Sequence, residues 1–164
     1  MSGWWPTKIR QFLRHVFGRV PERERRALAD WLTPKQLALF DSMHRADRRH
    51  GLDVVRALRA AGHTEPDVLL AGLLHDAGKG RGVGAWHRVG WSLAVHYGMG
   101  VRRIYVRLPG FRQAFEVLDG HPAASAELAT AAGCSERCAE LIRHQHDPVD
   151  DTLGVALHLA DEAS

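Results

Sequence analysis

Cysteine is scarce in this chain of 164 residues, and long apolar runs are missing from it. The two cysteines, Cys134 and Cys138, lie four residues apart, which gives no disulfide framework and is typical of a protein from a reducing compartment. The longest apolar run spans residues 68–74 and is far shorter than the ~18 residues that a membrane span needs. Residues 1–6 lack the basic start and the apolar stretch of a secretory signal. These absences predict a cytoplasmic protein without a transmembrane segment.

The strict alternation of apolar and polar residues that marks a half-buried strand is also missing. Helix signals are frequent instead: Thr33-Pro34 joins a capping hydroxyl to a proline at the first helical position, and Gly62 ends a predicted helix over residues 44–61. Residues 66–74 are apolar nearly all round, as expected of a buried central helix. Further helices are predicted over residues 85–97, 111–119, 122–132, 136–146 and 151–162. The sequence, which shows no internal repeat and no long linker, therefore predicts a single all-α bundle of seven to nine helices.

The N-terminal part of the chain carries an amphipathic pattern. Its apolar residues recur at helical spacing and are Trp5, Ile9, Phe12, Leu13, Val16 and Phe17. We expect residues 1–42 to form a helical extension packed on a main domain over residues 43–164. The stripe would cover the protein's own core or the same stripe of a second copy in a homodimer, and binding to a membrane surface is the alternative.

The formal net charge is only +3, but it is unevenly distributed. Basic residues cluster in residues 1–30 and again at Arg102, Arg103, Arg107 and Arg112, whereas residues 145–164 carry five acidic residues and no lysine or arginine. This asymmetry permits an anionic ligand. Solvated basic faces are the simpler interpretation, and we expect no stable binding of nucleic acid.

Histidine is abundant, with eleven residues against two tyrosines. Several histidines and acids occupy positions where the helical pattern predicts core, and an unpaired buried charge is very unfavourable. These inward-facing residues are His50, His75, Asp76, His121, His144 and Asp161. Each of them alone is explained by a hydrogen-bonded core side chain or a helix cap, but a bound cation explains all of them together. A mixed set of nitrogen and oxygen ligands favours Fe, Mn, Co, Ni or Zn and argues against a thiolate site.

The segments "RRHGLDVVRAL", "DVLLAGLLHDAGKG" and "LHLADEAS" resemble the HD-domain metal-dependent phosphohydrolases, whose signature is H…HD…D. The resemblance covers residues 43–164, and it implies a helical bundle in which His50, His75-Asp76 and Asp161 ligate metal. His121 and His144 resemble the additional histidines of the dinuclear branch, which implies two divalent ions bridged by Asp76. His146 is the alternative to His144, because the histidine pair of that branch is split here by Gln145. The DGxGYP motif of the cyclic-dinucleotide phosphodiesterases in that branch is absent.

The function implied by the resemblance is hydrolysis of a phosphoester or phosphoanhydride bond in a nucleotide or another small phosphorylated substrate. Two divalent ions, with Fe or Mn favoured and Co, Ni, Zn or Mg as alternatives, would activate a water molecule for in-line attack on phosphorus. Asp76 and Lys79 are the expected catalytic residues, with Lys79 placed to contact a phosphoryl oxygen unless it is a solvated loop lysine. Arg81 and Arg88 are weaker candidates for the same role. The alternative function is a non-catalytic HD module that binds metal or nucleotide for regulation.

Overall fold

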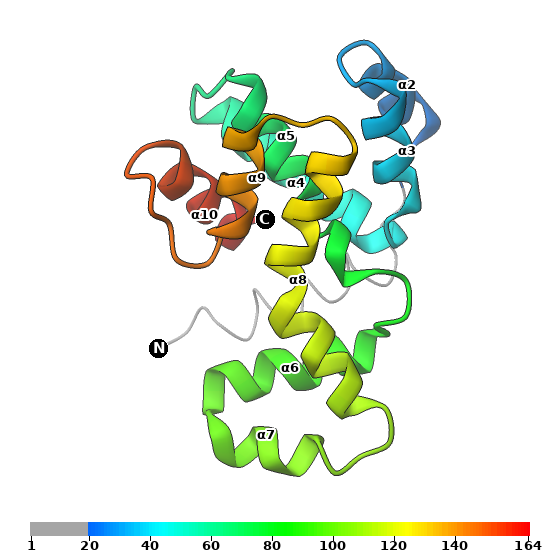
Figure 1. Cartoon of the computed structure of the whole chain (residues 1–164), viewed down its shortest axis with the longest axis vertical. Helices are drawn as coiled ribbons and strands as arrows, with labels where there is room; N and C mark the ends of the chain where they lie inside the picture. Colours follow the sequence, from blue (N-terminus) through cyan, green and yellow to red (C-terminus); the bar gives the residue numbers. More distant parts are fainter. Residues whose placement is uncertain (1–19) are drawn as a thin grey trace.

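The computed structural model describes residues 20–164, and this part of the chain holds α-helices and one short 3-10 helix but no strand (Figure 1). The elements are α2 (Glu22–Ala29), α3 (Pro34–Ser42), α4 (Arg45–Ala60), α5 (Pro66–Leu74), η1 (Ala77–Lys79), α6 (Ala85–Tyr97), α7 (Met99–Tyr105), α8 (Phe111–Ala131), α9 (Glu136–Arg143) and α10 (Leu153–Ala163). The predicted all-α bundle of seven to nine helices is thus confirmed, with nine α-helices over the described range. No helix within residues 20–164 combines the length and the apolar character that crossing a membrane requires.

The predicted apolar stripe at residues 5–17 lies outside the described residues, so its packing and the homodimer built on it stay predictions. Residues 20–42 of the predicted extension lie within the described part of the chain. Leu28, Leu32 and Phe40 of the α2–α3 segment are buried in the same hydrophobic cluster as α5. Thr33 caps α3 as predicted, because its hydroxyl accepts from the backbone N–H of Gln36 and the Gln36 side chain accepts from the backbone N–H of Thr33.

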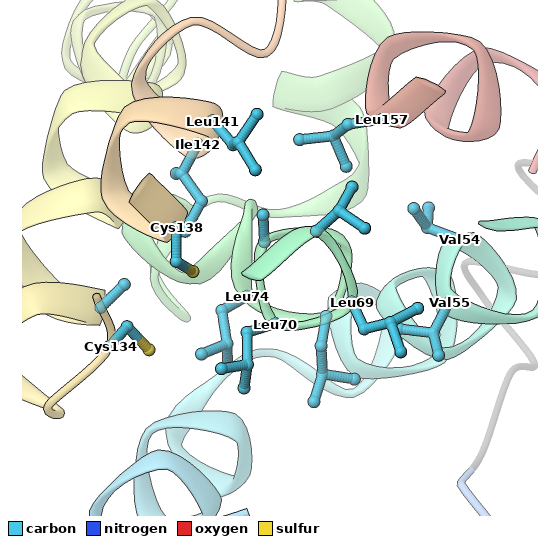
Figure 2. Close-up of a cluster of buried hydrophobic side chains, with 14 of the residues drawn as sticks. Val54, Val55, Leu69, Leu70, Leu74, Cys134, Cys138, Leu141, Ile142 and Leu157 are labelled. Atoms are coloured by element: carbon cyan, nitrogen blue, oxygen red, sulfur yellow. The ribbon is translucent and has the colours of Figure 1, made fainter. Parts of the chain in front are cut away.

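Helix α5 forms the centre of the bundle, since each of its residues from Val68 to Leu74 is buried. Figure 2 shows its leucines among the side chains of α4, α9 and α10, which cover it from separate sides. The free cysteines Cys134 and Cys138 are buried in this same core. A helix that is apolar all round needs such cover on every side, and this arrangement fixes where the C-terminal end of α5 lies.

Gly51 sets how closely α4 approaches α5. A Cβ atom at this position would lie 2.5 Å from the carbonyl oxygen of Leu73, a backbone atom that cannot move aside as a side chain can. Alanine favours a helix interior over glycine by ~1 kcal/mol, but at Gly51 the contact would push the two helices apart. The neighbouring residue His50 depends on the same approach for its position near the end of α5.

Gly51→Ala is therefore expected to destabilise the protein by about 2–3 kcal/mol, measured by urea unfolding, because overpacking against a backbone outweighs the helix propensity. Gly120→Ala in α8 is the matched control, since an added Cβ atom there meets no heavy atom within 4 Å. That control should leave the free energy of unfolding unchanged or raise it slightly. Equal stability of the two variants would show that Gly51 does not limit the helix approach.

Helix α8 runs without interruption from Phe111 to Ala131, so the break predicted between residues 119 and 122 is wrong. Pro122 lies inside the helix and has no N–H to donate to the carbonyl of Leu118, four residues earlier. The Nδ1 atom of His121 donates to this carbonyl instead, at 2.5 Å. The helix continues because an imidazole takes the place of the missing backbone donor.

Helix α9 ends at Arg143, three residues before the predicted end at 146. Ser135 caps its start as predicted, with its hydroxyl accepting from the backbone N–H of Cys138. At the other end, residues 144–147 form a tight turn in which the backbone N–H of Asp147 donates to the carbonyl of His144. Pro148 disfavours helical geometry at Asp147, so the helix could not have continued past this turn.

Helices α6 and α7 form a hairpin at one end of the molecule, beside the first half of α8 (Figure 1). Helix α7 was not predicted, because it is short and lies between glycines and basic residues. A small cluster lies between the hairpin and α8, in which Val83, Ala114 and Leu118 are buried and Trp91 of α6 packs against them. The hairpin is thus a separate layer on the main bundle.

Candidate metal centre

Three imidazoles and two carboxylates meet where α4, the end of α5, α8 and α10 come together. Their side chains form a continuous series of short contacts, which runs His50, Asp161, His75, Asp76, His121. The Nε2 atom of His50 lies 2.7 Å from Oδ1 of Asp161, which itself lies 3.5 Å from Nε2 of His75. Oδ1 of Asp76 then lies 3.4 Å from Nε2 of His75 and 3.5 Å from Nε2 of His121. The fold therefore brings together five of the six predicted metal ligands, and we call these five residues the His–Asp cluster.

The two oxygens of Asp76 have different surroundings. Oδ2 accepts a hydrogen bond from Nζ of Lys79 at 2.7 Å. Oδ1 is buried and has no hydrogen-bond partner among the described residues, although two imidazole nitrogens are near it. A buried carboxylate oxygen without a donor is unfavourable, and a cation between it and the imidazoles would remove this cost. The nitrogen and oxygen atoms of His50, His75 and Asp76 all lie within 4.8 Å of one another, which suits coordination of one ion.

Backbone carbonyls orient two of the imidazoles. The Nδ1 atom of His75 donates to the carbonyl of Gly72 at 3.0 Å, as His121 Nδ1 does to Leu118. Each ring thereby presents Nε2 to the cluster. Metal-ligating histidines almost always hold their second nitrogen in this way, because the bond fixes the tautomer and the ring orientation.

Charge within the cluster shifts three pKa values strongly. Burial by itself lowers the pKa of His75, but the carboxylates of Asp76 and Asp161 outweigh it and raise the pKa to about 9. Burial acts in the opposite sense on the two carboxyl groups. Even so, His75 and Lys79 hold the pKa of Asp76 well below its usual range, and His75 and His50 do the same for Asp161. Without metal at neutral pH, the cluster thus contains a charged imidazole between two carboxylates.

The stability that His75 contributes to the metal-free protein should be lost as the pH rises. Its folded-state pKa of about 9 exceeds the ordinary 6.5, so the charged ring stabilises fully below pH 6.5 and progressively less toward pH 9. We expect the melting temperature, measured with a chelator present, to fall over this window. His75→Gln should flatten this part of the profile, and an equally steep fall in that variant would exclude His75 as the cause.

His144 does not join the His–Asp cluster. Its Nε2 atom lies 3.5 Å from Oε2 of Glu140 on the outer side of α9, and its side chain is 41% exposed. It lines a separate surface pocket with Arg137, Pro148 and other residues.

His146, the alternative named from the sequence, lies instead beside His121, with 5.4 Å between the ring centroids. Burial and the neighbouring His121 lower the pKa of His146. The early end of α9 explains the difference, because a helix continued to residue 146 would direct these side chains differently.

Gln145 is a member of the site that the sequence interpretation missed. Its side chain is fully buried, and Nε2 donates to the carbonyl of His75 at 3.3 Å while lying 3.5 Å from Nε2 of His121. Its Oε1 atom has no hydrogen-bond partner among the described residues. His158 holds the same turn, because its Nδ1 atom lies 3.0 Å from the carbonyl oxygen of Gln145. The position between two histidines was the available signal for Gln145, but periodicity alone does not separate a buried amide from a solvated one.

The predicted phosphate-binding residues have different surroundings. Lys79 lies at the cluster through its bond to Asp76. Arg88 forms a bidentate ion pair with the buried carboxylate of Asp47, and Arg81 donates to the carbonyls of Asp41 and Ser42 at the end of α3. The guanidinium groups of Arg81 and Arg88 thus hold elements together, which leaves Lys79 as the candidate cation for a phosphoryl group.

Residues from four separate helix segments converge on the His–Asp cluster. Its imidazole and carboxylate donors suit a borderline divalent ion such as Fe, Mn or Zn. No protein-family model matches this chain, and no curated protein or solved structure matches it either.

Proposed function

We propose that this protein is a metal-dependent phosphohydrolase, which cleaves a phosphoester or phosphoanhydride bond of a nucleotide-like or other small phosphorylated substrate. The observation that carries the proposal is the buried Oδ1 atom of Asp76, which lacks a hydrogen-bond donor and lies within 3.5 Å of two imidazole nitrogens. A divalent cation is the group that such an oxygen and such nitrogens bind together. The resemblance of the H…HD…D pattern to HD-domain phosphohydrolases supports the reaction class.

We infer that the site would hold two ions. His50, His75, Asp76 and Asp161 would hold one ion, and Asp76, His121 and His146 would hold a second, with Asp76 shared. Fe and Mn are favoured, and Co, Ni, Zn and Mg are the alternatives. A bound divalent ion supplies an ionised water near neutral pH and positive charge for the phosphoryl oxygens.

The protein's own groups prepare the site for this chemistry. The carbonyls of Gly72 and Leu118 accept from the Nδ1 atoms of His75 and His121, so each ring in its neutral form would direct an Nε2 lone pair toward a bound ion. Lys79 offsets the charge of Asp76 and would donate an N–H to a phosphoryl oxygen of the substrate. The core around α5 excludes water behind the cluster, which strengthens these electrostatic interactions.

Metal analysis of freshly purified protein, combined with a substrate panel, tests the proposal. The panel contains nucleotides, dinucleoside polyphosphates and cyclic dinucleotides, assayed with and without a chelator. We expect bound divalent metal, hydrolysis of at least one class, and loss of both hydrolysis and thermal stability on chelation, each restored by added metal. Bound metal without hydrolysis of any class would favour the non-catalytic metal- or nucleotide-binding module. An absence of affinity for Mn, Fe, Co, Ni and Zn would overturn the site itself.

A further inference from the structure

The α6–α7 hairpin has an unusual charge. Residues 77–115, which are the hairpin and its flanking segments, contain seven lysines and arginines and no aspartate or glutamate. Lys79 and Arg88 pair with Asp76 and Asp47 outside this range. Arg102 is paired with Asp119 of α8. Arg103, Arg107 and Arg112 are exposed, and within residues 20–164 none of them has an ion-pair partner. Arg103 and Arg107, with Arg112 at the start of α8, thus leave this part of the surface positively charged without compensation from an acidic residue of the hairpin.

The same hairpin exposes large apolar side chains. Val95 is 63% exposed, Met99 64% and Ile104 64%, and Tyr97 is also exposed. Every residue from 95 to 100, where α6 turns into α7, is exposed. In Figure 1 this turn lies at the free end of the hairpin, away from the helices that form the core of the bundle. Apolar side chains that project from a basic surface at a free end are typical of a binding surface.

The inner face of the hairpin is packed, so the exposed side chains belong to an ordered surface. Tyr105 stacks on Phe111 with 5.2 Å between the ring centroids, and Phe111 contacts Phe115 edge to face. A Cβ atom at Gly90 would meet these rings at 2.7–3.0 Å, so glycine is needed for the close packing. The exposed apolar side chains therefore have no room to fold back into this small core.

We propose that the free end and outer face of this hairpin, residues 95–108, bind an anionic lipid surface. Aliphatic side chains such as Met99 and Ile104 would enter the headgroup boundary, while Arg103 and Arg107 would pair with lipid phosphates. Symmetric pairing with a second copy is disfavoured, because it would bring the same arginines against each other without acids. Nucleic acid is the competing partner, and Val95, Met99 and Ile104 favour lipid over it because these exposed side chains offer no hydrogen bond to a base or a sugar. The inference stands independently of the proposed hydrolysis.

Co-sedimentation of the full chain with vesicles tests the proposal. The chain should bind vesicles of equal parts phosphatidylglycerol and phosphatidylcholine, bind pure phosphatidylcholine much less, and lose binding at high salt. Arg103→Glu combined with Arg107→Glu should lower the partition coefficient at least about 30-fold. Its matched control is Arg23→Glu with Lys35→Glu, an equal change of charge at exposed positions of α2 and α3, which should bind nearly as the parent chain does.

The apolar contribution is tested separately. Val95→Ser, Met99→Ser and Ile104→Ser together should lower partitioning about 10-fold or more without lowering the melting temperature. Val155→Ser with Leu159→Ser, at exposed positions of α10, is the control that should leave binding intact. The proposal is overturned if neither hairpin variant weakens binding, if removal of residues 1–18 alone abolishes it, or if the hairpin changes affect only RNA binding or dimerisation.

Discussion

Asp76→Asn is expected to remove both bound metal and turnover. Asparagine keeps the shape of the side chain, but it loses the negative charge that two ions would share, and it leaves His75, Lys79 and His121 around a neutral amide. We expect metal content near zero after dialysis and a fall in hydrolysis of at least about 1,000-fold, because charge stabilisation by bound metal is worth several kcal/mol. Elemental analysis and a steady-state assay measure the two quantities on the same preparation.

The control for this variant is Asp47→Asn. Asp47 is also buried and paired with a cation, Arg88, but it lies outside the His–Asp cluster. The Asp47→Asn variant should be less stable, because it leaves the Arg88 guanidinium without its ion pair, but it should still bind metal. If Asp76→Asn retained its metal and its activity, the cluster would be a structural ion-pair network and the proposed function would fail.

Changing His146 and His144 separately should give opposite results. His146→Ala and His121→Ala are expected to reduce metal content from about two ions toward one per chain and to lower activity at least 10-fold, as loss of the second ion's charge would require. His144→Ala should change neither quantity, because this side chain contacts Glu140 on the outer face of α9. The two histidines are separated by one residue, so each variant is the control for the other.

Other results for the three alanine variants of His121, His144 and His146 would each lead to a different conclusion. If all three alanine variants keep their metal and activity, the site holds a single ion ligated by the remaining members of the cluster. If His144→Ala alone is impaired, the turn over residues 144–147 rearranges when metal binds. A reduced melting temperature without a change in metal content would assign His121 a packing role in α8.

Much of the fold could be predicted from hydrophobic periodicity and from capping residues, because most of the helices have clear local sequence signals. Thr33-Pro34 begins a helix as predicted, and the apolar run ending at Leu74 is the buried centre of the bundle. The convergence of His75-Asp76 with His50 and Asp161 could be anticipated as well, since charged groups at the end of a buried helix need partners. Their order along the chain, matched to a known pattern, indicated which partners to expect.

The misplaced features depended on interactions that hydrophobic periodicity does not show. Pro122 predicts the first turn of a helix. The bond from His121 to the Leu118 carbonyl explains why α8 continues past this proline. The end of α9 at Arg143 determines that His146, and not His144, lies beside His121. Gln145 is buried through contacts with His75 and His121, which are distant in sequence. The first two differences arise from local interactions that hydrophobic periodicity does not show, and the third arises from tertiary structure.

Pro122 also implies an evolutionary trade-off between a stable helix and an ordered site. An alanine at this position would give α8 a backbone bond and a better helix former, so selection for stability alone would discard the proline. The restored N–H would compete with His121 for the Leu118 carbonyl, and the ring would lose the bond that directs its Nε2 atom toward Asp76. If the cluster is the site proposed above, related sequences that keep the proline are expected to keep His121 as well, and loss of the proline should accompany loss of this ligand.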